Sequence, residues 1–581
     1  MTNEHEWDAT ESAMLPTATE VVVVGGTDDL IPGWCSARLR GAGPMTVTSV
    51  EAIRRLAGER LGFSRLRPGQ LEAVGTAAAG RDVLAVLPTG AGKSAIYELA
   101  GLLTAGPTVV VSPLIALQED QLAHLRAAGL SAIVLNSTQS IGARTEALAA
   151  SRGRDEFVFV SPEQLTNAET REALRRARPG LFVVDEAHLI SQWGQDFRPD
   201  YLRVGAQADA LGAGVRMALT ATAAPPVRHE IIRRLGLRDP EVVVGDFDRP
   251  EIYLSVHQVG SAKAKQREIE RAATELEGSG IVYAATRAGA HAVKDALEAA
   301  GHDVTVYHAG LPGAARREAM ERFLDGSARI VSATVAFGMG IDKPDVRWVL
   351  HAEPPGSLDA YYQEIGRAGR DGQPAHARLV YRQADLATAR YLSARDVSAA
   401  TVARVAEWLT DGTGGKSIDA LADATGLGSR SVTLAIARLV DVGAARWVAD
   451  GRAGWSESIS VPDALLASRD ATAREHEIEG SRLEMMRRYA EHAGCRRSFL
   501  LTYFGQDYEG PCGACDNDRQ RPATIKAEEP FPIGTRVSSE RWGHGTIQRY
   551  DGDQVTVLFD DHGYRDLAVS IVLEKALLRV Y

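Results

Sequence analysis

The sequence contains little cysteine, no long apolar run and no excess of positive charge. Four cysteines among 581 residues cannot form the disulfide framework of a small secreted domain, and three of them cluster late in the chain, which indicates a metal site in a reducing cytosol. No apolar run approaches the roughly 20 residues of a membrane span. The start, MTNEHEWDAT, lacks the basic and apolar regions of a secretory signal. We therefore expect a cytoplasmic protein, nucleoid-associated if bacterial, with no membrane partner.

The acidic balance limits how the chain could contact nucleic acid. Its net charge is −11, so it does not coat nucleic acid by bulk charge, and any such contact must come from local patches. The composition, 45% hydrophobic and 24% charged, is typical of globular proteins. A chain of this length exceeds one hydrophobic core and predicts three to five domains.

Short apolar runs that alternate with helical stretches predict two α/β domains in tandem. The first series of buried strands covers 82–87, 108–112, 157–161 and 181–185. A second series begins near residue 280 with GIVYAAT and continues with VTVYHA, ARIVSAT and VRWVLHAE. Strands separated by enough chain for a helix are typical of parallel sheets. We place the first domain at 45–245 and the second at 246–385.

The remaining segments differ from these two domains. Residues 1–44 show no sustained periodicity, whereas helical spacing begins after Met45, so we expect 1–44 to be disordered or to precede a true start at Met45. SIDALADATGLGSRSVTLAIARLV has a helix–turn–helix pattern, and a hairpin follows it. The expected units are a winged-helix-like unit at 386–480, a metal-binding helical module at 481–518, a linker at 519–530 and a small SH3-like or Tudor-like β-barrel at 531–581.

The segment LPTGAGKS predicts a phosphate-binding loop between a strand and a helix. Gly90 and Gly92 allow a tight turn whose N–H groups point at phosphate oxygens, with Thr89 in the same loop. Lys93 can reach the β- and γ-phosphates, and Ser94 can offer its hydroxyl to Mg²⁺. A chance glycine-rich turn is the alternative, which the strand before and the helix after disfavour.

A DEAH segment and a later arginine-containing segment offer the partner chemistry. Asp185 can hold Mg²⁺ through water, and Glu186 can polarise an attacking water. Acidic pairs are common on surfaces, but this one follows LFVV and is accompanied by LTATA at 219–223. YYQEIGRAGRDG contributes Gln363, Arg367 and Arg370, and a helical turn would place both arginines on one face. They can supply positive charge at the γ-phosphate, unless they are simply a solvated basic helix start.

These segments together resemble superfamily two helicases, and more closely the RecQ family of DNA helicases. The resemblance rests on LGFSRLRPGQLEAV, VVVSPLIALQEDQ, SQWGQDFRPDY, VYHAGL and ATVAFGMGIDKPDVRWVLH, with CRRSFLLTYFG and CGACD in the metal module. It covers 48–385 and 481–518. It implies two RecA-like motor domains, ATP as cofactor, Arg67 and Gln70 gripping adenine, and ATP-driven DNA unwinding with 3′→5′ movement.

The segment SQWGQDFRPDY matches the family's aromatic-rich loop. Trp193 and Phe197 beside Arg198 can stack on bases, which contributes about 1–3 kcal/mol per base. Core packing is the alternative and competes more strongly for Phe197. The family usually has His where Gln195 stands, which leaves open how tightly DNA binding is coupled to hydrolysis. The expected partner is DNA with a single-stranded tail next to duplex, at forks or junctions.

The late cysteines predict a zinc site in the family's zinc module. Cys495 precedes a Cys512-x-x-Cys515 turn, and tetrahedral Zn²⁺ needs four donors. Where the family carries a fourth cysteine, this chain has Asp518, whose carboxylate can bind zinc. His492 or a water could take that position instead, and three reduced cysteines in a small core are the alternative to any metal.

A run rich in arginine precedes and enters this cysteine segment. Between 481 and 497 lie five arginines against two glutamates, which predicts a DNA-backbone patch. The predicted contacts are Arg487, Arg488, Arg496 and Arg497.

The sequence therefore favours an ATP-dependent DNA helicase that acts in repair and recombination. A translocase or nucleic-acid remodeller without strong unwinding shares the same motor, as does an RNA-directed DEAH helicase. An ATP-regulated DNA-binding module with a decayed ATPase is a further alternative, disfavoured because Lys93, Asp185, Glu186 and Arg370 are all present. In the family the winged helix usually follows the zinc module, whereas here it precedes it.

Overall fold

The computed structural model covers the whole chain and describes most of it from Ser49 onward. The described ranges are 49–88, 90–113, 115–135, 157–191, 199–338, 343–393, 397–411, 415–448, 452–456, 458–508, 510–518, 530–551 and 553–580. Residues 1–44, Thr89 and the aromatic-rich loop with Trp193, Phe197 and Arg198 lie outside these ranges. No helix of the described residues is long and apolar enough to cross a membrane.

The first α/β domain is built around a parallel sheet of seven strands in the order β3-β4-β2-β5-β6-β1-β7. Its strands are β1 (Val83–Val86), β2 (Thr108–Val111), β3 (Ala132–Leu135), β4 (Phe157–Val160), β5 (Leu181–Val184), β6 (Val215–Thr220) and β7 (Glu241–Val244). Six of these strands, β1 to β6, are buried along their whole length. A sheet covered on both faces requires such continuous apolar runs, and this confirms the four strands predicted for this domain.

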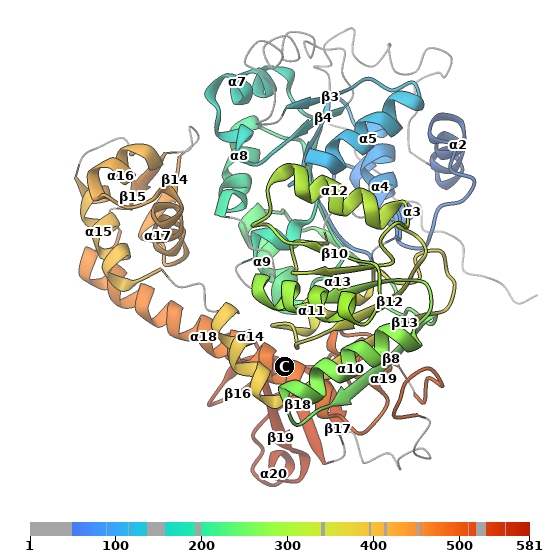
Figure 1. Cartoon of the computed structure of the whole chain (residues 1–581). Helices are drawn as coiled ribbons and strands as arrows, with labels where there is room; N and C mark the ends of the chain where they lie inside the picture. Colours follow the sequence, from blue (N-terminus) through green and yellow to red (C-terminus); the bar gives the residue numbers. More distant parts are fainter. Residues whose placement is uncertain are drawn as a thin grey trace, which may run out of the picture. The chain divides into compact units, whose positions relative to one another are not determined.

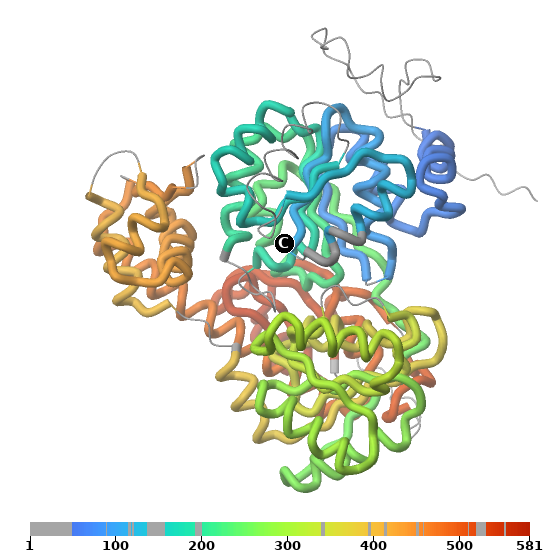
Figure 2. Tube along the Cα trace, turned by 45° about the horizontal axis from the view of Figure 1, so that its top comes forward, coloured from blue at the N-terminus to red at the C-terminus, as the bar shows by residue number. Residues whose placement is uncertain are grey.

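Two helices of the first domain precede β1, and the others come from the chain between its strands (Figures 1 and 2). They are α2 (Val50–Leu61), α3 (Gln70–Ala78), α4 (Lys93–Leu103), α5 (Ile115–Ala127), α7 (Ala168–Ala177), α8 (Val204–Leu211) and α9 (Pro225–Leu235), with short 3₁₀ segments η1 (Gln164–Thr166), η2 (Ala187–Ile190) and η3 (Pro199–Arg203). Helix α2 begins where Ser49 caps the N–H of Ala52 and ends at Gly62, whose φ of 70° is left-handed. The predicted onset of helical structure after Met45 is therefore confirmed.

The second α/β domain contains a parallel sheet of six strands in the order β10-β11-β9-β12-β13-β8. The strands are β8 (Ile252–Gln258), β9 (Ser279–Tyr283), β10 (Val304–Tyr307), β11 (Ile330–Ala333), β12 (Val346–His351) and β13 (Ala375–Tyr381). The helical elements are α10 (Ala262–Glu275), α11 (Arg287–Ala299), α12 (Gly313–Leu324), α13 (Leu358–Ile365), η4 (Gln383–Asp385) and α14 (Leu386–Ser393). All four strands predicted for this domain are present, and the structure adds β8 and β13.

Three helices and a hairpin follow, of which the helix–turn–helix pattern predicts the last two helices, and the hairpin after them was also predicted. They are α15 (Ala399–Thr410), α16 (Ile418–Thr425), α17 (Ser429–Asp441), β14 (Ala445–Trp447) and β15 (Ala453–Trp455). Helix α18 (Val461–Glu491), drawn in orange in Figure 1, then runs without interruption for 31 residues. The predicted boundary at 480/481 falls inside this helix and is wrong, because one continuous helix belongs to both neighbouring units.

The C-terminal segment forms a five-stranded antiparallel sheet in the order β19-β18-β17-β16-β20. After α19 (Arg496–Tyr503), its elements are β16 (Arg536–Ser539), β17 (Gly543–Asp551), β18 (Gln554–Phe559), β19 (Gly563–Ala568), α20 (Val569–Glu574) and β20 (Arg579–Val580). Its core includes Val537, Ile547, Val555, Val557 and Phe559. This sheet is consistent with the predicted SH3-like unit.

Candidate nucleotide site and metal centre

The predicted phosphate loop lies between β1 and α4, at the carboxyl edge of the first sheet. Gly90 and Gly92 have φ values of 82° and 75°, a left-handed conformation that glycine adopts without strain. Gly92 is also confined by a neighbour, because a Cβ there would lie 2.7 Å from Gln70 Nε2. Helix α4 begins at Lys93, whose Nζ donates to Leu87 O at 3.5 Å. The loop therefore has the strand, turn and helix start that phosphate binding requires.

The two residues predicted to grip adenine, Arg67 and Gln70, are hydrogen-bonded to this loop. Gln70 is buried, and its Nε2 donates to Ala91 O at 3.0 Å and Gly92 O at 2.8 Å. Its Oε1 accepts from Arg67 N at 2.6 Å, and the Arg67 guanidinium donates to Gly90 O. The structure thus brings the LRPGQ segment and the phosphate loop into one site.

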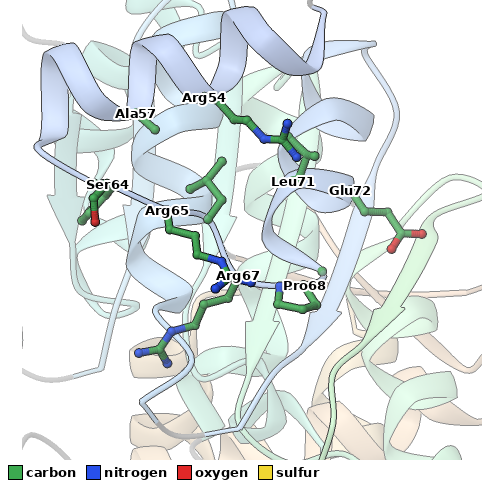
Figure 3. A pocket seen from close by; sticks show the side chains of 11 residues that line it. Arg54, Ala57, Ser64, Arg65, Arg67, Pro68, Leu71 and Glu72 are labelled. Atoms are coloured by element: carbon green, nitrogen blue, oxygen red, sulfur yellow. The ribbon is translucent and has the colours of Figure 1, made fainter. Parts of the chain in front are cut away.

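A pocket of about 570 Å³ opens beside this segment (Figure 3). Its wall includes Arg54 from α2, Phe63, Arg65 and Pro68. Aromatic and aliphatic walls with a few charged groups are typical of small-ligand sites. Arg67 belongs to the same wall, so this pocket can accept a base next to the phosphate loop.

The acidic pair lies directly after β5, at the same edge of the sheet. Glu186 N donates to Asp185 Oδ1 at 3.0 Å, and Glu186 adopts a left-handed φ of 50°. Burial raises the pKa of Asp185 to about 7, the charge of Glu186 adds to this, and Lys93 opposes it. A further cation beside Asp185 would lower its pKa again, because it favours the charged form of the carboxylate. Bound Mg²⁺ would therefore keep Asp185 ionised, as a metal ligand must be.

The second domain contacts this region through α13. Gln363 Nε2 donates to Thr222 Oγ1 at 2.5 Å and lies 3.5 Å from His188 Nε2. His188 belongs to the DEAH segment, and its Nδ1 lies 3.0 Å from Thr220 Oγ1. The LTATA and DEAH segments of the first domain and Gln363 of the second therefore form one polar cluster.

The two predicted arginine fingers lie close behind Gln363, but not as predicted. Helix α13 ends at Ile365, so Arg367 and Arg370 are in the turn after it. The expectation that a helical turn places them on one face is therefore wrong, because the helix stops before either arginine. Both are partly buried, and their role at a γ-phosphate stays a prediction.

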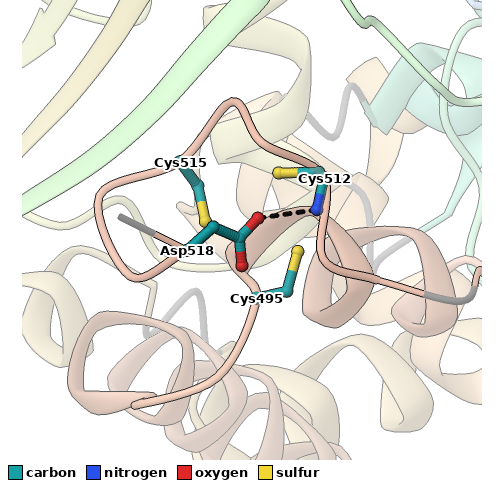
Figure 4. Close-up of side chains that lie close together, drawn as sticks. All are labelled: Cys495, Cys512, Cys515 and Asp518. Carbon is teal, nitrogen blue, oxygen red and sulfur yellow. Dashed lines mark hydrogen bonds between the residues drawn. The ribbon is translucent and has the colours of Figure 1, made fainter. Parts of the chain in front are cut away.

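The late cysteines and Asp518 meet in one cluster (Figure 4). One ligand atom from each of Cys495, Cys512, Cys515 and Asp518 lies within 4.8 Å of the other three. Asp518 Oδ2 accepts from Cys512 N at 2.6 Å and Gly513 N at 3.0 Å. Three thiols and one carboxylate are a donor set that fits tetrahedral Zn²⁺. Among the described residues His492 is not part of this cluster, and its ring packs on Phe499.

The cysteine turn is fixed to the second domain, which the sequence did not reveal. Leu254 N, in β8, donates to Ala514 O at 3.1 Å, and Asp516 N donates back to Leu254 O at 3.0 Å. Asp516 Oδ2 also accepts from Val256 N at 2.9 Å. A metal held at this turn would therefore be linked directly to the edge strand of the second sheet.

The predicted DNA patch on the neighbouring helices is contradicted for two of its arginines. Arg496 and Arg497 are each only 4% exposed and pair at 2.5 Å with Asp516 and Asp248. Side chains buried in ion pairs cannot contact a phosphate backbone. The sequence count missed this because the neutralising carboxylates lie outside 481–497.

The other two arginines of the predicted patch are partly exposed and also paired. Arg487 pairs with Glu484 and Glu491, and Arg488 pairs with Glu484 and Asp566. The local positive charge is therefore largely neutralised by these carboxylates.

Comparison with known families gives three matches along the chain. Residues 67–230 match the DEAD/DEAH box helicase model, residues 264–372 the helicase conserved C-terminal domain, and residues 459–519 the RecQ zinc-binding model. The third match begins near the start of α18, which agrees with the single long helix seen here.

Proteins named ATP-dependent DNA helicase RecQ are similar over much of the chain. The one from Pasteurella multocida is 31% identical over 474 residues, which cover 81% of this chain and 62% of that protein. The one from Bacillus subtilis is 39% identical over 335 residues (57% and 56%), and the one from Synechocystis is 40% identical over 333 residues (56% and 69%). This chain thus spans about three fifths of the length of the Pasteurella relative.

A solved structure of Mycobacterium smegmatis helicase Lhr bound to ssDNA and AMP-PNP is similar with a TM-score of 0.49 and 20% identity, over 73% of this chain and 62% of that one. A likeness at this level does not establish a family. The RecQ zinc-binding match and the identity to the Synechocystis relative do, and they show that this chain belongs to the RecQ helicase family.

Proposed function

We propose that this protein is an ATP-dependent DNA helicase that moves 3′→5′ along one strand and separates duplexes in repair and recombination. The observation that carries the proposal is the bond from Gln363 to Thr222, which joins the second domain to the segment beside His188 and the acidic pair. A motor of this kind needs one nucleotide site shared by two domains, because hydrolysis must change how the domains contact each other. ATP is the expected substrate, and DNA with a single-stranded tail next to duplex is the expected partner.

The residues of the site divide the work of phosphoryl transfer among them. Lys93 binds the β- and γ-phosphates, and Glu186 orients the attacking water. Ser94 and Asp185 would hold Mg²⁺, which when bound supplies neutralisation of the phosphate charge. Arg367 and Arg370 stabilise the charge that develops on the transferred group. Arg67 and the pocket beside it hold the base.

DNA contact is proposed on the sequence alone for the aromatic-rich loop. Trp193, Phe197 and Arg198 follow the DEAH segment directly, so stacking of a base there would act close to Glu186. The buried pairing of Arg496 and Arg497 removes them from the contact surface. Membership of a family of DNA-acting enzymes also supports a cytoplasmic location.

We further propose that Cys495, Cys512, Cys515 and Asp518 hold one structural Zn²⁺. The donor types and their mutual distances support this. The metal would join α19 to the turn that bonds to β8, so that its binding energy stabilises the attachment of the module to the second domain.

Measuring ATP hydrolysis with and without single-stranded DNA tests the proposed function. We expect DNA to stimulate the wild type, and Lys93→Ala to lower the stimulated rate by about 100-fold or more, because the lost ammonium is the side-chain cation that binds the phosphates. DNA binding should stay unchanged. Lys263→Ala, an exposed lysine on α10, is the matched control. A Lys93→Ala protein that hydrolyses ATP at the wild-type rate would refute the site.

A further inference from the structure

Asp359 is a buried carboxylate at which both motor domains and the helices of the zinc module converge. It lies on α13 one helical turn before Gln363 and is 6% exposed. Its Oδ1 accepts from Ala224 N of the first domain at 3.3 Å. Its Oδ2 accepts from Arg482 Nη2 of α18 at 2.7 Å and from the Tyr503 hydroxyl of α19 at 2.6 Å. This one side chain of α13 thus contacts the first domain, α18 and α19.

The contacts of Asp359 and Gln363 fall on the same short segment of the first domain. Gln363 donates to Thr222 and Asp359 accepts from Ala224, two residues later. Residues four apart on a helix lie on one face, so this face of α13 is held against residues 222–224 at two points. Arg228, in the first turns of α9, links the same segment to the end of α19, because it donates to Ala223 O and to Phe504 O.

The C-terminal barrel reaches the same cluster through Tyr564. The ring of Tyr564 stacks on that of Tyr503, with centroids 5.3 Å apart and planes 26° apart. Tyr564 N donates to Ser481 Oγ at 3.1 Å, and a Cβ on Gly563 would lie 2.2 Å from that hydroxyl. The first residues of β19 therefore lie directly on α18. The last of the three family matches ends at residue 519, before this barrel.

Arg482 stays charged although it is buried, because it pairs with Asp359 at 2.7 Å. Burial alone would lower the pKa of Arg482, but the adjacent charge of Asp359 reverses this and raises it. Removing one partner of such a pair leaves an unpaired buried charge, whereas replacing both by apolar groups is often neutral. Substitutions can therefore separate two roles of Asp359, the pairing of its charge with Arg482 and the positioning of α13 against the first domain.

We propose that Asp359 is a positioning residue for ATP hydrolysis, and that the barrel braces it through Tyr564 and Tyr503. The inference rests on the proposed ATPase function. Helix α13 carries Gln363 and leads into Arg367 and Arg370, so the hold on Asp359 sets how these groups face the first domain. A small misplacement of reacting groups lowers the chemical rate far more than it weakens substrate binding.

The first test compares steady-state kinetics with thermal stability. Asp359→Ala should lower kcat of DNA-stimulated hydrolysis roughly tenfold or more and leave KM for ATP nearly unchanged, while it also lowers the melting temperature. The double variant Asp359→Ala with Arg482→Met removes both charges and should recover the melting temperature but not kcat. Asp359→Asn with Arg482→Met keeps an oxygen that can accept from Ala224 N, and it should recover both.

A matched control separates this from general loss of stability. Asp385 is another buried carboxylate of the second domain, paired with Lys265 and Arg382. Asp385→Ala should lower the melting temperature without changing kcat. If kcat of the Asp359→Ala and Arg482→Met double variant returns together with its stability, Asp359 is only structural and the inference is wrong.

The second test addresses the barrel. Tyr564→Ala should lower kcat several-fold because Tyr503 loses its stacking partner, whereas Tyr564→Phe keeps the ring and should match the wild type. Arg565→Ala breaks a barrel contact with Glu477 outside the cluster and serves as control. A wild-type kcat in Tyr564→Ala would contradict the bracing role.

The failure of the proposed function and the failure of this inference give different results. If the wild type shows no DNA-stimulated hydrolysis, the proposed function is wrong and this inference is wrong with it. If the wild type is active and Asp359→Ala has the same kcat, only the inference is wrong.

Discussion

Asp518 is the residue at which the proposed zinc site departs from the four cysteines that the family resemblance implies. A carboxylate is a harder ligand than a thiolate, so we expect this site to hold zinc less tightly than four cysteines would. Asp518→Cys should raise the zinc affinity, and Asp518→Ala should lower it. Metal analysis and competition with a chelator would measure both.

The control for this test is Asp507→Ala, an exposed carboxylate in the same segment that lies outside the cluster. If Asp518→Ala binds zinc as tightly as the wild type, Asp518 is not the fourth ligand and a water becomes the better candidate. If the wild type carries no zinc after gentle purification, the proposed zinc site is wrong.

Glu98 on α4 gives a pH-dependent prediction. It is 1% exposed, and burial raises its pKa from 4.5 to about 7. The folded state therefore binds its proton more tightly than the unfolded state does, so stability is lost as pH rises from about 4.5 to 7. Glu98→Gln should raise the free energy of unfolding at pH 8 by at most about 3 kcal/mol and leave it unchanged near pH 4.5.

Urea unfolding at the two pH values would measure this difference. His124 Nε2 lies 3.8 Å from Glu98 but is about half exposed, so its charge is largely screened by solvent. An equal gain at both pH values would mean that Glu98 is not protonated through this range and would contradict the account.

At the scale of elements, the four strands predicted in the first domain are continuous, largely apolar runs, although β3, which is equally apolar and buried, was missed. Strands such as β2 and β5 are apolar on both faces and stand out as continuous runs. Strand β6 was missed because Arg216 interrupts its run, although its guanidinium is accommodated by Leu235 O and Gly236 O. The pairing of Arg497 with Asp248 was unpredictable for a similar reason, since the partner lies about 250 residues away in sequence.

Arg497→Met tests whether Arg497 of α19 is a buried ion-pair residue and not a DNA contact. Its burial against Asp248 predicts a lower melting temperature, because the carboxylate loses its partner. The slope of log K against log salt for single-stranded DNA should equal that of the wild type, since no phosphate contact is removed. A slope smaller in magnitude by about one would mean that Arg497 contacts a DNA phosphate and would contradict its assignment as a buried residue.

Helix α17 shows that the winged-helix-like unit is engaged with the motor. Its Leu434 and Ala437 pack against Leu202 of the first domain, and Asp441 pairs with Arg234 at 3.0 Å. The helix–turn–helix pattern predicted the fold of this unit but not its contact surface.

At the scale of the whole molecule, the two α/β domains could be predicted from the sequence. The contacts that join the zinc module and the barrel to them could not. The phosphate loop, acidic pair and second-domain segment are local motifs, each readable from a few consecutive residues. The cluster around Asp359 joins residues 224, 359, 482, 503 and 564, whose proximity exists only in the fold. The zinc module and barrel are therefore attached at the junction of the two motor domains.

Strand displacement tests the central claim most directly. Duplexes with a 3′ or a 5′ single-stranded tail would be incubated with the wild type and ATP, with Lys93→Ala as the control that lacks the phosphate contact. We predict that the 3′-tailed duplex is separated, that the 5′-tailed one is not, and that Lys93→Ala separates neither. ATP hydrolysis stimulated by DNA without displacement of either duplex would contradict the helicase assignment and identify the protein as a translocase.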